Sequence, residues 1–189
     1  MDPMVKAAMA KWPNVPDCYG WLGLDARGRW WMRDDQTQHH GPFAGPGASR
    51  LSRGSELKHE KLIDFIQRNY ESDERGCWFF QNGPQRVFVE LERAPWIWRL
   101  QTPGSLQAHT GHCVNCQAVY VSKAGHLYAS SDRGWGVVHT QDMHQAAEWI
   151  EASLWLPQEI DDDRLALLAG FVLSPQALQQ KGGREPYEQ

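Results

Sequence analysis

Two stretches of the chain alternate apolar and polar residues on both sides of a turn that contains glycine. Residues 19–32 reverse direction around Gly28, and residues 119–128 reverse around Gly125. Glycine adopts positive φ without strain, and the aromatic and β-branched residues beside these turns suit a half-buried sheet surface. The pattern predicts two antiparallel β-hairpins.

A helical periodicity follows each predicted hairpin. Apolar residues that recur every three or four positions mark the buried face of an amphipathic helix. The first stripe consists of Leu62, Phe65, Ile66 and Tyr70. The second consists of Met143, Ala146, Ala147, Ile150 and Leu154. We expect Ser55 and Thr140 to cap these helices, because a hydroxyl can accept from the free N–H groups of a first turn.

Further strands are predicted between these elements. Residues 77–80 and 86–91 flank Asn82-Gly83, and Asn-Gly between apolar runs is a strong hairpin signal. Residues 95–100 and 135–139 read as single strands, whereas the apolar segment 165–173 is compatible with a short helix or a buried strand. We therefore predict an α+β fold of two repeated units of antiparallel β-hairpins, each with one amphipathic helix, packed through their aromatic faces.

Composition shifts suggest where the units end. The stretch 39–54, rich in glycine, proline and serine, is expected to be a mobile surface loop, and the polar stretch 101–111 is expected to link the two halves. The predicted division is residues 1–100 for an N-terminal hairpin-helix-hairpin unit, 101–175 for a C-terminal hairpin-helix unit, and 176–189 for a flexible polar tail.

The overall composition narrows the classes of partner. A formal net charge of -4 argues against holding a nucleic-acid backbone by bulk electrostatics. No long uncharged apolar run is present, and the four cysteines do not read as a secreted disulfide framework. We therefore expect a cytoplasmic protein without membrane contact, whose ten tryptophans mainly fill its interior.

The densest group of metal-ligating residue types lies just before the second hairpin. It contains His109, His112, Cys113 and Cys116. A Cys-x-x-Cys pair can bind one zinc ion, and two histidines could complete a tetrahedron. Structural zinc sites usually draw their second pair of ligands from a distant segment, so a reduced thiol pair without metal is the preferred interpretation. We expect no cofactor, with zinc as the alternative.

A second candidate site lies where the strand 135–139 meets the following helix. Free N–H groups at such a junction can bind an anion, and His139, Thr140 and Asp142 stand beside them. Trp135 lies between two glycines that could let a ligand approach the backbone. The competing interpretation is that these residues are structural. Thr140 would cap the helix, Asp142 would complement the helix dipole, the histidines would be solvated and the Trp135 indole would be packed.

Two other patterns have ordinary structural explanations. Arg27, Arg29 and Arg33 alternate with Trp30 and Trp31, a composition able to contact bases and phosphates, but strand alternation and the acidic total explain it equally well. The run 161–163 of three aspartates reads as a solvated turn or the first turn of a helix rather than a metal site.

A middle segment carries a family resemblance. It is built from Gly76-Cys77-Trp78-Phe79-Phe80, Pro84, Val87, Val89 and Ala94-Pro95-Trp96. These residues resemble the glycine-aromatic strand, threonine-proline turn and alanine-proline-aromatic close of a group of uncharacterised bacterial domains of unknown function. Asn82-Gly83 replaces the threonine, and the loop 39–54 is longer. The resemblance spans residues 19–150 and implies a repeated α+β motif and a role in signalling or ligand sensing, without catalytic residues.

These observations favour a non-catalytic cytoplasmic regulatory module that binds a small ligand or a protein. The alternatives are a zinc-stabilised interaction protein using the cluster 109–116, and an enzyme with a site at His139 and Asp142. No serine-nucleophile elbow or phosphate-binding glycine loop is present in the sequence to favour a particular reaction.

Overall fold

The structure, a computed structural model, describes residues 1–182. The chain forms two compact units, each assembled from separate segments of the sequence. Unit 1 comprises residues 1–24, 30–92 and the described residues from Val172 onward. Unit 2 comprises residues 25–29 and 93–171. The mixed α+β class is confirmed, with one sheet in each unit.

Unit 1 is built on a six-stranded sheet in the order β3-β2-β1-β6-β5-β4. Its strands, in chain order, are β1 (Cys18–Leu24), β2 (Trp30–Met32), β3 (Ser55–Glu56), β4 (Tyr70–Ser72), β5 (Trp78–Asn82) and β6 (Gln85–Leu91). The predicted hairpins β1–β2 and β5–β6 are confirmed. At the centre, however, β1 pairs with β6 in parallel, a long-range contact that local pattern does not show.

Unit 2 is built on a seven-stranded sheet in the order β13-β10-β11-β12-β7-β8-β9. Its strands, in chain order, are β7 (Trp96–Thr102), β8 (Ser105–Ala108), β9 (Cys113–Asn115), β10 (Ala118–Ser122), β11 (Leu127–Ser131), β12 (Gly134–Val138) and β13 (Gln158–Ile160). The second predicted hairpin is β10–β11, and Gly125 has the expected positive φ of 82°. Residues 101–111, expected as a linker, instead complete β7 and form β8, because they pair within the sheet.

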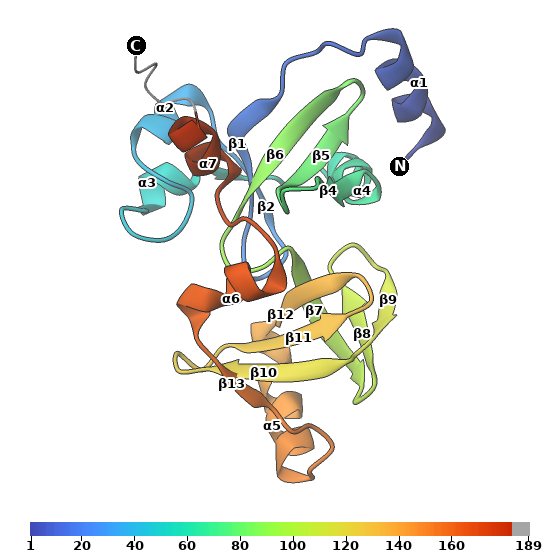
Figure 1. The fold of residues 1–189 in the computed structure, drawn as a ribbon, viewed down its shortest axis with the longest axis vertical. Helices are drawn as coiled ribbons and strands as arrows, with labels where there is room; N and C mark the ends of the chain where they lie inside the picture. Colours follow the sequence, from blue (N-terminus) through green and yellow to red (C-terminus); the bar gives the residue numbers. More distant parts are fainter. Residues whose placement is uncertain (183–189) are drawn as a thin grey trace, which may run out of the picture. The chain divides into compact units, whose positions relative to one another are not determined.

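Seven α-helices and one 3-10 turn accompany the sheets within residues 1–182 (Figure 1). They are α1 (Pro3–Lys11), α2 (Asp35–His39), α3 (Arg50–Arg53), α4 (Glu60–Arg68), η1 (Thr140–Asp142), α5 (Met143–Glu151), α6 (Asp162–Ala169) and α7 (Pro175–Gly182). The helices predicted over 62–70 and 143–154 correspond to α4 and α5, and the ambiguous segment 165–173 contributes to α6.

Both predicted helix caps are wrong. The N-cap of α4 is His59, whose ring accepts from the backbone N–H of Leu62, while Ser55 belongs to β3. Thr140 opens η1, and the N-cap of that turn is His139. The N-cap of α5 itself is Asp142, which makes no side-chain cap bond, so composition rules alone misplaced both helix starts.

Aromatic side chains build the interior of each unit, as predicted. In unit 1, Tyr19 stacks on Phe88 with ring centroids 4.6 Å apart. In unit 2, Trp96 and Trp98 stack at 5.9 Å over Gly136. A Cβ at Gly136 would lie 2.4 Å from the Trp98 indole nitrogen, so this glycine makes room for a packed indole.

The loop 39–54, expected to be mobile, is held by a buried arginine. Arg33 is 1% exposed, and its guanidinium donates to the carbonyl oxygens of Ser52 at 2.7 Å, Gly20 at 3.1 Å and Gly41 at 2.6 Å. Phe43, also buried, packs against Gly23. These contacts hold the loop against the sheet, and each of the three guanidinium nitrogens of Arg33 donates a hydrogen bond to the backbone.

The C-terminal segment returns to unit 1. The Leu91 N–H donates to the Leu173 carbonyl, and the Ser174 hydroxyl and Gln176 N–H both donate to the carboxylate of Glu90. Burial raises the pKa of Glu90 against the opposing effect of these two donors. Residues 176–182 of the predicted tail are thus part of α7, and the remainder lies outside the described residues.

No helix within residues 1–182 has the length and apolar character needed to cross a membrane.

Candidate ligand-binding cleft

Unit 1 contains an open cleft of about 560 Å³ between the N-terminal segment and the β5–β6 hairpin. Its lining residues are Met9, Trp12, Pro13, Asn14, Val15, Pro16, Asp17, Gln81, Pro84 and Arg86. A volume in this range suits a small molecule, and apolar walls with a few polar groups are typical of such sites. The cleft is therefore the first place in unit 1 to look for a ligand.

The outer wall of the cleft is fixed by contacts at both of its ends. Helix α1 lies against the β5–β6 turn (Figure 1). The approach is close, since a Cβ built on Gly83 in this turn would lie 3.9 Å from the Ala8 Cβ. The Gln85 side-chain amide donates to the Pro16 carbonyl at 3.0 Å. Prolines at positions 13 and 16 further restrict the connecting backbone. The wall is thus preorganised rather than dependent on a ligand.

Gln81 supplies the most unusual polar group of the cleft. The residue is 1% exposed, and its Nε2 donates to the Gly83 carbonyl at 2.9 Å. This bond assigns the amide orientation and leaves Oε1 buried, without a hydrogen-bond donor among the described residues. A buried acceptor without a donor costs about 1–3 kcal/mol, so such groups in native proteins call for an explanation.

Arg86 lies beside Gln81 on the same face of the hairpin. The two residues are direct cross-strand partners in the antiparallel β5–β6 pair, and such partners project from the same side of a sheet. The Arg86 guanidinium is exposed and lies 5.2 Å from the Phe79 ring centroid. This stacking orients the cation while leaving its N–H groups available to an anion.

The junction predicted at His139, Thr140 and Asp142 lies in unit 2, where hydrogen bonds from neighbouring residues reach Asp142 and His139. Asp142 accepts from Arg99 Nε at 2.7 Å, from Arg99 Nη2 at 2.8 Å, and from the Leu100 N–H at 2.9 Å. His139 Nδ1 accepts from the Gln141 N–H, and Thr140 is exposed. These bonds engage the Asp142 carboxylate and His139 Nδ1, two of the groups that the sequence assigned to a ligand.

The acid-base properties of this junction follow from the same contacts. Burial lowers the pKa of His139, and the charges of Arg99 and Arg27 lower it further. Burial acts to raise the pKa of Asp142, but the hydrogen bonds from Arg99 and Leu100 outweigh it and the pKa lies below its ordinary value. With these lowered pKa values, His139 is mostly neutral and Asp142 is ionised at neutral pH. Neither group therefore carries the proton that a general acid must donate.

Trp135 does not join that junction. It lies four residues before His139 along extended β12, a separation of about 13 Å at the usual rise per residue. Its ring stacks on Tyr120 with centroids 4.3 Å apart. The structure therefore brings His139, Thr140 and Asp142 together but places Trp135 elsewhere on the sheet.

The four proposed zinc ligands have dissimilar environments. His109 is half-buried with its Nε2 atom inaccessible to solvent, and desolvation of the ring lowers its pKa to about 3, whereas His112 and Cys113 are exposed. Cys116 is half-buried and follows directly after β9, which begins at Cys113. Within residues 1–182, no group of three or more histidine, cysteine or acidic side chains is arranged to hold a metal ion. Zinc binding is therefore not part of the function that we propose.

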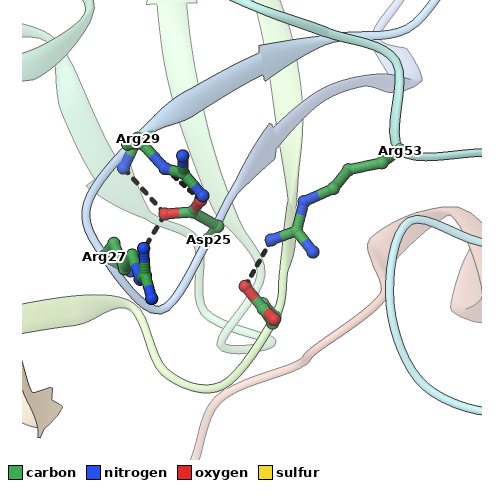
Figure 2. Close-up of polar contacts among 5 residues, drawn as sticks. Asp25, Arg27, Arg29 and Arg53 are labelled. Atoms are coloured by element: carbon green, nitrogen blue, oxygen red, sulfur yellow. Dashed lines mark hydrogen bonds and ion pairs between the residues drawn. The ribbon is translucent and has the colours of Figure 1, made fainter. Parts of the chain in front are cut away.

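Two arginines of the first hairpin, Arg27 and Arg29, take part in the hydrogen bonds that form its turn. Asp25 accepts at 2.9 Å from the backbone N–H groups of Arg27 and Arg29, and at 2.7 Å from the Arg29 side chain (Figure 2). In unit 1, Arg53 forms an ion pair with Glu92 (Figure 2). With Arg33 buried as well, the alternation of arginine and tryptophan reflects strand geometry and turn formation.

The aspartate run 161–163 begins α6, as the sequence predicted. Asp161 is the N-cap and accepts from the Asp163 N–H at 3.4 Å. Asp162 accepts from the Tyr128 hydroxyl at 2.7 Å. Carboxylates in a first helical turn are favoured by the exposed N–H groups there, so this run has a structural explanation.

Sequence reasoning missed the cleft, although one signal was present. Gln81 follows Trp78, Phe79 and Phe80 on a strand that is buried throughout this stretch, and a polar residue there needs a partner. No local signal brings Asp17 or Trp12 to that strand, because the contact joins segments more than sixty positions apart.

Comparisons place this chain in a family. A family model described as "Protein of unknown function (DUF2946)", with the family name DUF2944, matches residues 1–183. The chain belongs to this family. The earlier resemblance to a domain of unknown function is thus supported at that level. No curated protein matches the chain.

Two solved structures are similar to this chain. A DUF1285 family protein from Silicibacter pomeroyi DSS-3 has 10% identity and a TM-score of 0.47, with 78% of this chain and 84% of that chain covered. A DUF1285 family protein from Shewanella baltica OS155 has 14% identity and a TM-score of 0.45, with 72% and 97% covered.

Proposed function

We propose that this DUF2944 protein is a non-catalytic cytoplasmic regulatory module that binds a small ligand in the cleft between Trp12 and Arg86. The observation that carries the proposal is Gln81, a residue of the cleft lining whose buried Oε1 lacks a donor among the described residues. The cleft residues contain no pairing of a nucleophile with a base, and so they favour binding over bond cleavage. Four free cysteines fit a reducing compartment.

A thermal-shift screen with amino acids, nucleotides, sugars and aromatic acids tests this function. A ligand at one hundred times its Kd should stabilise the wild type by about 2.7 kcal/mol, which raises the Tm by several degrees. Gln81→Met replaces the amide with an apolar side chain of similar length. We expect this variant to bind the same ligand about tenfold or more weakly, since it loses a buried hydrogen bond.

The control is Gln179→Met, which makes the same replacement on the exposed surface of α7. This variant should respond to the ligand as the wild type does. The proposal fails if no compound in the screen shifts the wild-type Tm. It also fails if Gln81→Met and the wild type show the same affinity for each compound that does.

A further inference from the structure

The cleft contains polar groups of opposite charge that are not paired with each other. Arg86 is exposed and Asp17 is exposed, and neither forms an ion pair within residues 1–182. An adjacent cation and anion on a protein surface that remain unpaired are both available to a ligand. Resting on the proposed function, we propose that the cleft binds a zwitterionic α-amino acid with a large apolar side chain.

The strand register explains why these groups face the same space. Cys18 pairs with Val87 in the parallel β1–β6 ladder, so Asp17 and Arg86, each one residue earlier, are neighbours across the two strands. Arg86 in turn is the cross-strand partner of Gln81. A carboxylate directly before β1, a guanidinium on β6 and an amide on β5 thus lie in a row, and all three residues line the cleft.

This row matches the two charged groups of an amino acid. The ligand carboxylate would accept from the Arg86 guanidinium, whose forked N–H groups suit a carboxylate. The ligand ammonium would donate to Gln81 Oε1, the buried acceptor, and would be attracted by the negative charge of Asp17. A purely anionic ligand would be repelled by Asp17, and a purely cationic ligand would be repelled by Arg86.

The walls supply a place for an apolar side chain. Met9, Trp12 and Val15 lie on the N-terminal side of the cleft, and Pro84 lies on the hairpin side. Trp12 is 51% exposed, so its ring offers apolar surface that a ligand in the cleft would cover. Burial of a phenyl or branched aliphatic group against these residues would add about 1.5–3 kcal/mol.

Isothermal titration calorimetry with L-phenylalanine tests the inference directly at neutral pH. Three analogues each remove one group: L-phenylalaninamide lacks the carboxylate, 3-phenylpropanoate lacks the ammonium, and L-alanine lacks the large side chain. We expect each analogue to bind the wild type about tenfold or more weakly than L-phenylalanine, because each leaves one charged group or one apolar wall unmatched.

Charge variants assign each ligand group to its residue. Arg86→Gln should remove the preference for L-phenylalanine over the amide, and Asp17→Asn should reduce the preference over 3-phenylpropanoate. The matched controls are Arg50→Gln and Asp64→Asn, which change exposed residues outside the cleft and should leave both preferences unchanged. Because these substitutions are at exposed positions, loss of folding does not confuse the result.

The outcomes separate this inference from the proposed function. It is overturned if L-phenylalanine does not bind the wild type at about 10 mM, or if the analogues bind equally well. If another class of compound then binds in a Gln81-dependent way, the ligand-binding function stands and only the amino-acid assignment falls. If no compound of any class binds, both fall.

Discussion

At the scale of single residues, His109 shows how a desolvated titratable group makes stability depend on pH. The residue is half-buried in unit 2, with its Nε2 atom inaccessible to solvent and the Trp96 ring centroid 5.8 Å away, and desolvation lowers its pKa from 6.5 to about 3. In the unfolded chain the same group titrates at its ordinary value. The folded protein therefore binds fewer protons than the unfolded chain between these two pKa values, so stability must decrease as the pH falls through that interval.

We predict that the wild type loses about 2 kcal/mol of unfolding free energy through His109 alone between neutral pH and pH 5. Urea denaturation of His109→Asn across that range should show a correspondingly smaller pH dependence, whatever its absolute stability. His112→Asn, an exposed histidine three positions later, is the control and should follow the wild-type profile. Parallel profiles for the wild type and His109→Asn would contradict the prediction.

At the scale of elements, Ser174 joins a helix cap to a buried charge. Its hydroxyl accepts from the Ala177 N–H at 3.2 Å in the first turn of α7 and donates to the carboxylate of Glu90. Ser174→Ala would remove both bonds and leave Glu90 with one fewer donor in a buried position. Hydrogen bonds to buried charged groups contribute more than exposed caps do.

We predict that Ser174→Ala lowers the unfolding free energy by about 2–3 kcal/mol and increases hydrogen exchange throughout α7. Asp34→Ala removes the N-cap bond of α2 to Thr37, an exposed pair, and serves as the comparison. That variant should be destabilised less than Ser174→Ala, because its cap is exposed to solvent. Equal costs, or unchanged exchange in α7, would show that the bond to Glu90 contributes little.

At the scale of the whole molecule, the two units are compact but not contiguous in sequence. Unit 1 needs the segment from Val172 onward, which is bonded to it by the Val172 N–H to the Gly76 carbonyl and by the Leu91 N–H to the Leu173 carbonyl. A fragment that ends at residue 100 lacks this segment and leaves the partners of Glu90 absent. The boundary predicted at residue 100 and the contacts of the folded chain therefore define different folding units.

We predict that a fragment of residues 1–100 does not unfold cooperatively. In contrast, a chain in which a short glycine-serine linker replaces residues 93–171 should keep a cooperative transition, since Leu91 and Leu173 are hydrogen-bonded neighbours and a short linker spans their ends. Urea denaturation followed by far-ultraviolet circular dichroism measures both. A cooperative transition in the 1–100 fragment would contradict this assignment of unit 1.

Several features were accessible from sequence because they depend on residues close together in the chain. The turns at Gly28 and Gly125 need positive φ, and the observed values are 76° and 82°. The apolar stripes of α4 and α5 likewise arise from spacings of three and four residues. Such signals are local, since backbone sterics and helix periodicity act over a few residues, and they correctly predicted the hairpins and the α+β class.

Other features required the folded chain. The parallel pairing of β1 with β6, the burial of Arg33 and the row formed by Asp17, Arg86 and Gln81 all join segments distant in sequence. The strand pairing that forms is the one that buries the most apolar area and gives buried polar groups hydrogen-bond partners. Neither quantity can be read from a short stretch of sequence. The sequence by itself thus determined the turns, strands and helices, whereas the tertiary structure alone decided which polar groups remain available to a ligand.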